Sequence, residues 1–230
     1  MSGGHQPWAA GYTSISDISF ALSNVSFSTS FSFGLCFAAW GLVSAFAVRF
    51  RERLQLTATE TALLVAVPVL LGALARLPVG ILADRFGGRL VFSALMAGVA
   101  VPVYLVPAAQ NYPSLLVAAL FLGLAGSSFA VGVGYVSRWS PPEKQGSVLG
   151  VYGMGNIGQS AAVFLGPLAA SAFGWENVFR AVAALLVATA MGFALLARDA
   201  PARTAPKGMG RWSRSSSTRG ARGRWLPSTS

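Results

Sequence analysis

The run TALLVAVPVLLGALARLPVGILA, residues 61–83, contains a single charged side chain, that of Arg76. A helix of about 20 apolar residues matches the hydrocarbon thickness of a bilayer. Over the whole chain 54% of the residues are hydrophobic and 10% are charged, whereas about a quarter of a soluble domain is charged. The composition therefore predicts an integral membrane protein built from helices.

Five further apolar runs follow the same pattern, and short loops connect them. Short connections make consecutive helices antiparallel neighbours. The sequence predicts an all-α membrane fold of six transmembrane helices within residues 31–200, after a polar N-terminal lead at 1–30. The predicted spans are residues 31–48, 61–83, 90–109, 114–136, 146–173 and 178–197.

The last 30 residues, 201–230, are rich in Ser, Arg and Gly and carry seven of the 17 basic residues. We expect this basic tail to be disordered. It is either a regulatory tail or the product of a frameshifted or prematurely ended reading of a longer gene. Because most of the net charge of +10 comes from the tail, the charge indicates no nucleic-acid partner.

Residues suited to catalysis or metal binding are scarce. The chain has one cysteine, Cys36, and one histidine, His5, so neither a disulfide nor a histidine cluster is expected. It contains no phosphate-binding loop and no paired nucleophile and base. We therefore expect no enzyme activity, no cofactor and no metal.

The segment GILADRFGGR, residues 80–89, closes the second span and opens the third. Its glycines allow a tight turn and a close approach of helices. The carboxylate of Asp84 suits a helix N-terminus, where the macrodipole favours an anion. An ordinary charged turn is the alternative interpretation. The candidate residues of this segment are Gly80, Asp84, Arg85, Gly87 and Arg89.

Arg76 lies seven residues before the end of its predicted span. An arginine at the centre of a membrane helix costs roughly 2.5–3.5 kcal/mol on insertion scales, so such a residue is a functional candidate. Its planar guanidinium binds oxyanions through paired hydrogen bonds, which favours a small planar anion as the ligand. The alternative is that its side chain extends to the headgroups at the nearer membrane surface.

The fifth span contains GVYGMGNIG, residues 150–158. Its glycines leave room for a backbone or a ligand to approach, and Asn156 places an amide in the hydrocarbon layer, which is costly without a partner. The alternative is a small-residue packing seam in which Asn156 forms an interhelical hydrogen bond.

The chain resembles the amino-terminal half of the nitrate/nitrite porter family of the major facilitator superfamily. The loop at 80–89 is similar to the signature loop of the superfamily, and GMGNIG resembles the nitrate signature of the porter family. Gln159 and Ser160 depart from it, because further small residues are common there. The matching stretches are Gly80–Arg89, Ala125–Ala130, Ser137–Glu143 and Gly153–Gly158.

The resemblance implies transport of nitrate and nitrite by alternating access across the inner (plasma) membrane, with both termini cytoplasmic, as in nitrate assimilation. Arg76 would clamp the anion together with an arginine of a second six-helix half. The candidate residues of the loop at 80–89 would take part in gating, in which Asp84 would meet a helix of that half. The remaining substrate-binding residues that it implies are Phe129, Asn156, Gly155 and Gly158.

Three questions remain open at this stage. The acidic residues lie outside the predicted spans, which favours an anion antiporter over proton symport, although a second half could supply a proton carrier. The substrate could be another small anion. The chain could also be a truncated remnant without transport activity, since a substrate site of this kind needs a second half or a second copy.

Overall fold

A computed structural model describes residues 15–140 and 142–199. This part of the chain is helical throughout, with nine α-helices and four short 3₁₀ segments. In order these are α1 (Ile15–Ala45), α2 (Ala47–Leu54), α3 (Ala58–Phe86), α4 (Gly88–Leu105), η2 (Val106–Ala108), α5 (Tyr112–Leu122), η3 (Gly123–Ser127), α6 (Ser128–Trp139), η4 (Pro142–Lys144), α7 (Gln145–Gly153), η5 (Met154–Asn156), α8 (Ile157–Phe173) and α9 (Trp175–Leu196).

Six helical stretches of the described residues are long and apolar enough to cross a bilayer, which confirms the predicted number of spans. Adjoining elements combine into single spans: α4 with η2, α5 through α6, and α7 through α8. The stretches are Val25–Ala45, Ala58–Phe86, Gly88–Ala108, Tyr112–Trp139, Gln145–Phe173 and Trp175–Leu196.

The first helix differs most from the predicted span. It begins at Ile15, well before residue 31, and ends at Ala45. The residues before 31 are rich in Ser, and polarity by itself does not end a helix. Val48, predicted to close the span, lies instead in the short amphipathic helix α2. Residues 1–14 of the predicted lead, and all of the predicted tail, lie outside the described residues.

Local signals explain where the second span begins and ends. Thr57 caps α3 through a capping box: its hydroxyl accepts from the Glu60 amide at 3.2 Å, and the Glu60 carboxylate accepts from the Thr57 amide at 2.8 Å. The helix then runs to Phe86 and stops at Gly87, whose φ is +92°. Gly174, with φ +81°, joins α8 to α9 in the same way. Only glycine adopts this backbone conformation readily.

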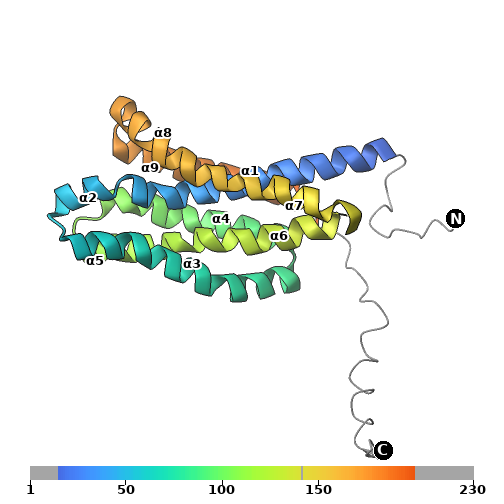
Figure 1. Cartoon of the computed structure of the whole chain (residues 1–230), viewed down its shortest axis with the longest axis horizontal. Coiled ribbons are helices and arrows are strands. Elements are labelled where there is room, and N and C mark those ends of the chain that lie inside the picture. Colours follow the sequence, from blue (N-terminus) through green and yellow to red (C-terminus); the bar gives the residue numbers. More distant parts are fainter. Residues whose placement is uncertain (1–14, 141, 200–230) are drawn as a thin grey trace, which may run out of the picture. The chain divides into compact units, whose positions relative to one another are not determined.

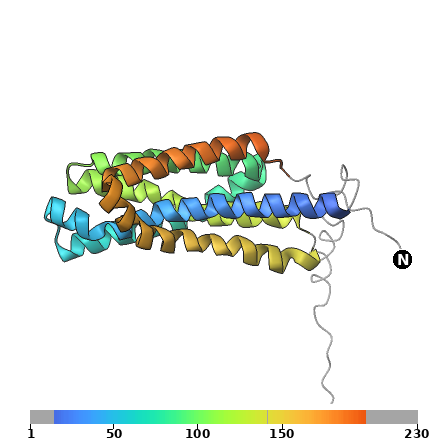
Figure 2. The same cartoon turned by 90° about the horizontal axis from the view of Figure 1, so that it is seen from above.

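The helices are arranged so that α3 and α8 lie at opposite edges, with α1, α4 and α6 between them (Figure 1). Contacts run from α3 to η3 and α6, from α6 to α1, and from α1 to α8, so these elements form a row of neighbours. Helices α4 and α9 pack closely on each other (Figure 2). Buried Phe, Leu and Val side chains from α1, α4, α6 and α9 fill the space between.

Candidate functional site

Arg76 lies on the exposed side of α3, next to the exposed side chain of Leu77. Gly72, one turn earlier on the same side of the helix, and Pro68 are buried against η3, so Arg76 lies where the packed side of α3 meets its exposed side. Among the described residues the guanidinium makes one hydrogen bond, from Nε to the carbonyl oxygen of Gly126 at 3.4 Å. A guanidinium carries five N–H donors, so most of its capacity to bind an anion is unused within the described part of the chain.

Small residues bring α3 close enough to η3 for this contact. A Cβ added to Gly123 would lie 2.2 Å from the carbonyl oxygen of Pro68, and one added to Gly72 would lie 2.7 Å from that of Gly123. Only glycine fits at such distances. Arg76 follows Gly72 by one helical turn, and residues four apart lie on the same side of a helix. The seam therefore places Arg76 beside Gly126.

Phe129 lies on α6, two residues after η3, and its side chain is 37% exposed. Its ring centroid lies 5.9 Å from that of Tyr152 and 5.6 Å from that of Phe33, both of which are buried. The Tyr152 hydroxyl donates to the carbonyl oxygen of Ser128 at 3.1 Å. Phe129 is thus an exposed ring supported from behind by a buried aromatic pair.

Asn156 is exposed at the end of η5. Its Nδ2 donates to the carbonyl oxygen of Gly153 at 3.1 Å, within its own turn. The alternative interpretation of this segment is a packing seam of small residues with an interhelical hydrogen bond from Asn156. Asn156 forms no such hydrogen bond with any described residue. The assignment of Asn156 to substrate binding stays a prediction.

Gly155 and Gly158 form the other feature of that alternative, a packing seam. A Cβ on Gly158 would lie 1.9 Å from the carbonyl oxygen of Gly34 on α1, and a Cβ on Gly155 would lie 2.2 Å from the ring of Phe33. Both glycines let α8 and η5 lie directly against α1. Their contact with substrate stays a prediction.

Arg76, Phe129 and Asn156 lie on neighbouring elements, and no hydrogen bond or ring contact in the described part of the chain joins one of them directly to another. Arg76 contacts Gly126, Phe129 contacts Tyr152 through its ring, and Tyr152 precedes Asn156 by one turn. The structure adds two interruptions that sequence reasoning missed: the fourth span narrows to 3₁₀ geometry at η3 and the fifth at η5. Such segments inside long helices often mark functional sites. Closely spaced glycines, at 123 and 126 and at 153 and 155, were the available signal.

The predicted conformational residues lie at the α3–α4 junction. Asp84 belongs to the last turn of α3, not to a loop, because the helix continues to Phe86. Its carboxylate forms an ion pair with Arg138, a residue in the last turn of α6. Gly80 and Asp84 also line a cavity of about 230 Å³ together with Arg138. Arg85 lies with its guanidinium carbon 5.5 Å from the ring centroid of Phe86.

The carboxylate at the N-terminus of α4 is that of Asp199, which the sequence did not single out. Asp199 Oδ1 accepts from the Arg89 amide at 2.9 Å. Arg89 also donates through Nε to the carbonyl oxygen of Ala194 at 2.7 Å. The sequence suggested that the Asp84 carboxylate would cap a helix N-terminus. At α4 the capping carboxylate is that of Asp199, and Asp84 pairs with Arg138 instead. The end of α9 is tied to the start of α4 instead.

Several known proteins are similar to this chain. The profile of the Major Facilitator Superfamily matches residues 28–227. A "Probable nitrate/nitrite antiporter" of Thermus thermophilus is 41% identical over 176 residues, which is 71% of this chain and 39% of that protein. A "Probable nitrate/nitrite transporter" of Mycobacterium tuberculosis is 38% identical over 168 residues, 72% of this chain and 42% of that protein.

A "Nitrite extrusion protein" of Bacillus subtilis is 36% identical over 155 residues, covering 67% of this chain and 39% of that protein. Among solved structures, a bacterial homolog of the human lysosomal transporter Spinster, in inward-facing and unoccupied conformation, superposes with a TM-score of 0.71 at 19% identity. The match covers 84% of this chain and 47% of that one, and it concerns the fold alone. The chain spans about two fifths of the length of the curated relatives it matches.

Proposed function

This chain belongs to the major facilitator superfamily, and on that premise we propose that it supplies the amino-terminal half of a transporter that exchanges nitrate and nitrite across the inner membrane by alternating access. The multi-pass membrane fold with six spans, and relatives named as nitrate or nitrite transporters, support the proposal. Both termini would face the cytoplasm.

The proposal rests on the exposure of Arg76 and on its few hydrogen bonds. A guanidinium on the exposed side of a membrane helix, with a single hydrogen bond of 3.4 Å to the described residues, is expensive in lipid. A nitrate ion is planar and presents oxygen pairs that match the guanidinium fork. Binding of an oxyanion would satisfy both the charge and the unused N–H donors.

The exposed sides of α3 and of η5–α8 support the need for a second wall. Arg76, Asn156 and Ser160 are all exposed there, and polar groups at membrane depth normally face protein or a water-filled cavity. In the most apolar stretch of the fifth span, only 11% of the residues are buried, against 56% in the third. We propose that a second six-helix half, or a second copy of the chain, covers these surfaces.

Exchange is favoured over proton symport by the positions of the acidic groups. Within residues 15–140 and 142–199, the carboxylates in the six spans are Glu60, Asp84 and Glu176, and each lies within three residues of a helix end. A proton relay through a membrane needs titratable groups at depth. In this proposal, the incoming anion is balanced by the outgoing one.

The test is nitrate uptake by a chimera in which residues 25–199 replace the matched segment of the Thermus thermophilus relative. We expect saturable uptake of labelled nitrate in a host that lacks its own nitrate transporters, with acceleration by internal nitrite. The 230-residue chain alone, reconstituted in liposomes, should give no saturable flux, because one wall of the site is missing. Uptake of a different anion without competition by nitrate would contradict the substrate assignment.

A further inference from the structure

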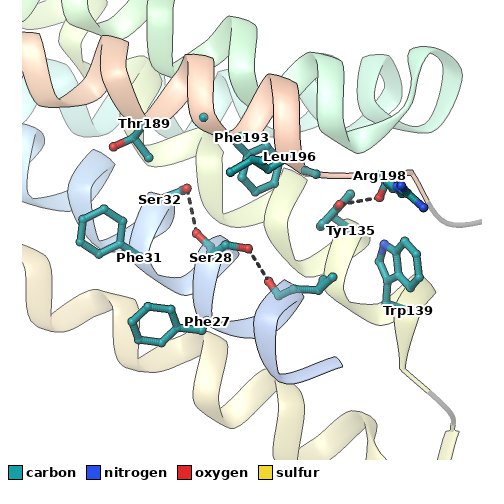
Figure 3. Close-up of a pocket in the computed structure, with 13 residues that line it drawn as sticks. Phe27, Ser28, Phe31, Ser32, Tyr135, Trp139, Thr189, Phe193, Leu196 and Arg198 are labelled. Atoms are coloured by element: carbon teal, nitrogen blue, oxygen red, sulfur yellow. Dashed lines mark hydrogen bonds between the residues drawn. The ribbon is translucent and has the colours of Figure 1, made fainter. Parts of the chain in front are cut away.

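A groove of about 670 Å³ lies between the first part of α1 and the last part of α9, with α6 behind it (Figure 3). Its volume is within the range of roughly 300–1,000 Å³ that small-molecule sites occupy. None of the predicted substrate or conformational residues lines it. The groove is therefore separate from the candidate transport site.

The groove has a polar end and an apolar end. Trp139 and Leu196 stand at the ends of their membrane spans and line the groove, so its polar end lies at the membrane boundary. Arg198 follows there, and the hydroxyl of Tyr135 donates to its carbonyl oxygen at 2.6 Å. Deeper in the membrane the walls are mostly apolar, with the rings of Phe31 and Phe193 facing the space beside Ser32 and Thr189 (Figure 3).

Trp139 closes the polar end of the groove. Its side chain lines the groove and is 7% exposed, and its indole N–H is covered by the protein beside the hydroxyl of Tyr135. Interfacial tryptophans usually lie at the level of the lipid headgroups, so Trp139 marks that level in the groove. Ser28 and Ser32 donate to carbonyl oxygens of their own helix.

We propose that this groove binds one anionic phospholipid, with an acyl chain between α1 and α9 and its phosphate at Arg198. The Arg198 guanidinium would donate to the phosphate oxygens and supply the positive charge, with the Trp139 side chain at the headgroup level. Arg89 and Asp199 lie close to Arg198, with Asp199 bonded to the Arg89 amide and the Arg89 side chain bonded to Ala194. Because the charges of Arg89 and Asp199 offset each other, the net charge of the three residues is that of the Arg198 guanidinium, which is positive.

Gly192 allows the groove to be filled without disturbing the helices. It lines the groove, and a Cβ added there would meet no atom within 4 Å. Gly98 on α4 is a matched control, since it is equally unobstructed but lines a different apolar groove beside α5. Gly192→Leu should occupy the acyl space, and Gly98→Leu should leave it unchanged.

The test is native mass spectrometry of the full chain in detergent, titrated with phosphatidylglycerol or with phosphatidylcholine of the same chains. We expect one phosphatidylglycerol bound per chain, and binding at least about tenfold weaker in Gly192→Leu but unchanged in Gly98→Leu. Arg198→Gln should abolish the preference for phosphatidylglycerol. Equal binding in Gly192→Leu and Gly98→Leu would overturn the proposal.

A second measurement needs no variant. Phosphatidylglycerol with a photoreactive diazirine on its acyl chain should label peptides from residues 25–32 and 189–197 of the unmodified protein. Equal labelling of Gln145–Phe173, the described span with the smallest buried share, would show that the lipids only coat the protein and would refute a specific site.

Discussion

The hydroxyl of Tyr152 occupies the place where a side chain on Gly132 would have to be. A Cβ added to Gly132 would lie 2.1 Å from that oxygen. The same hydroxyl donates to the carbonyl oxygen of Ser128, and the tyrosine ring is fully buried. This contact joins α7 to α6 directly behind Phe129 and so determines where the exposed ring of the candidate site stands.

Gly132→Ala should lower the unfolding free energy by about 1–3 kcal/mol, because a buried ring cannot move aside at little cost. The measurement is thermal unfolding of the purified protein in detergent. Gly134→Ala is the control, since its Cβ would meet nothing within 4 Å and alanine favours a helix. If the steric account is right, Gly132→Ala should cost much less in a Tyr152→Ala background. A full loss there would contradict it.

Gly158→Ala should lower the unfolding free energy by about 1–3 kcal/mol, because its Cβ would lie 1.9 Å from a backbone oxygen of Gly34. The measurement is thermal unfolding, which needs no transport assay. A backbone atom cannot rotate away, so α1 and α8 must separate. Gly153→Ala, five residues earlier with open space around it, should leave the melting temperature nearly unchanged. Normal thermal stability of Gly158→Ala would show that this glycine does not hold the two helices together.

Arg76→Lys should reduce nitrate uptake by the chimera roughly tenfold to a hundredfold, the effect of losing a charged hydrogen-bonded fork. Its melting temperature should change little, because Arg76 makes only a 3.4 Å hydrogen bond to the described residues. Arg180→Lys, an exposed arginine in the first turns of α9, should transport as the parent does. Unchanged uptake in Arg76→Lys would remove this residue from the anion site and leave headgroup contact as its role.

Asp199→Ala should cost about 0.5–2 kcal/mol of stability, as for a lost helix cap, because the Asp199 carboxylate accepts from the N-terminal turn of α4. Asp199→Asn retains an acceptor oxygen and should lose less. Glu176→Ala is the control: Glu176 lies in the first turn of α9 and pairs within its helix at 3.9 Å, so its removal should cost less than 1 kcal/mol. Equal losses for Asp199→Ala and Glu176→Ala, measured by thermal unfolding, would argue against tertiary capping.

Much of the fold was predictable because hydrophobicity along a chain is a local property. The length of each apolar run and the turn signals at Thr57, Gly87 and Gly174 locate five spans to within a few residues. The first span was misplaced because its early residues are polar but helical. The 3₁₀ interruptions at η3 and η5 were missed because glycine spacing in a membrane helix is also typical of ordinary packing.

The amino-acid sequence by itself determined that this protein crosses a membrane six times within the described residues, and which residue types could bind an anion. The tertiary structure decided the surroundings of each: Arg76 exposed, Gly158 pressed against α1, and Asp199 at the start of α4. Side chains point outward all around a helix, and the neighbouring helices determine which of them become buried. For that reason the roles of single glycines and charges depend on contacts between residues far apart in the sequence.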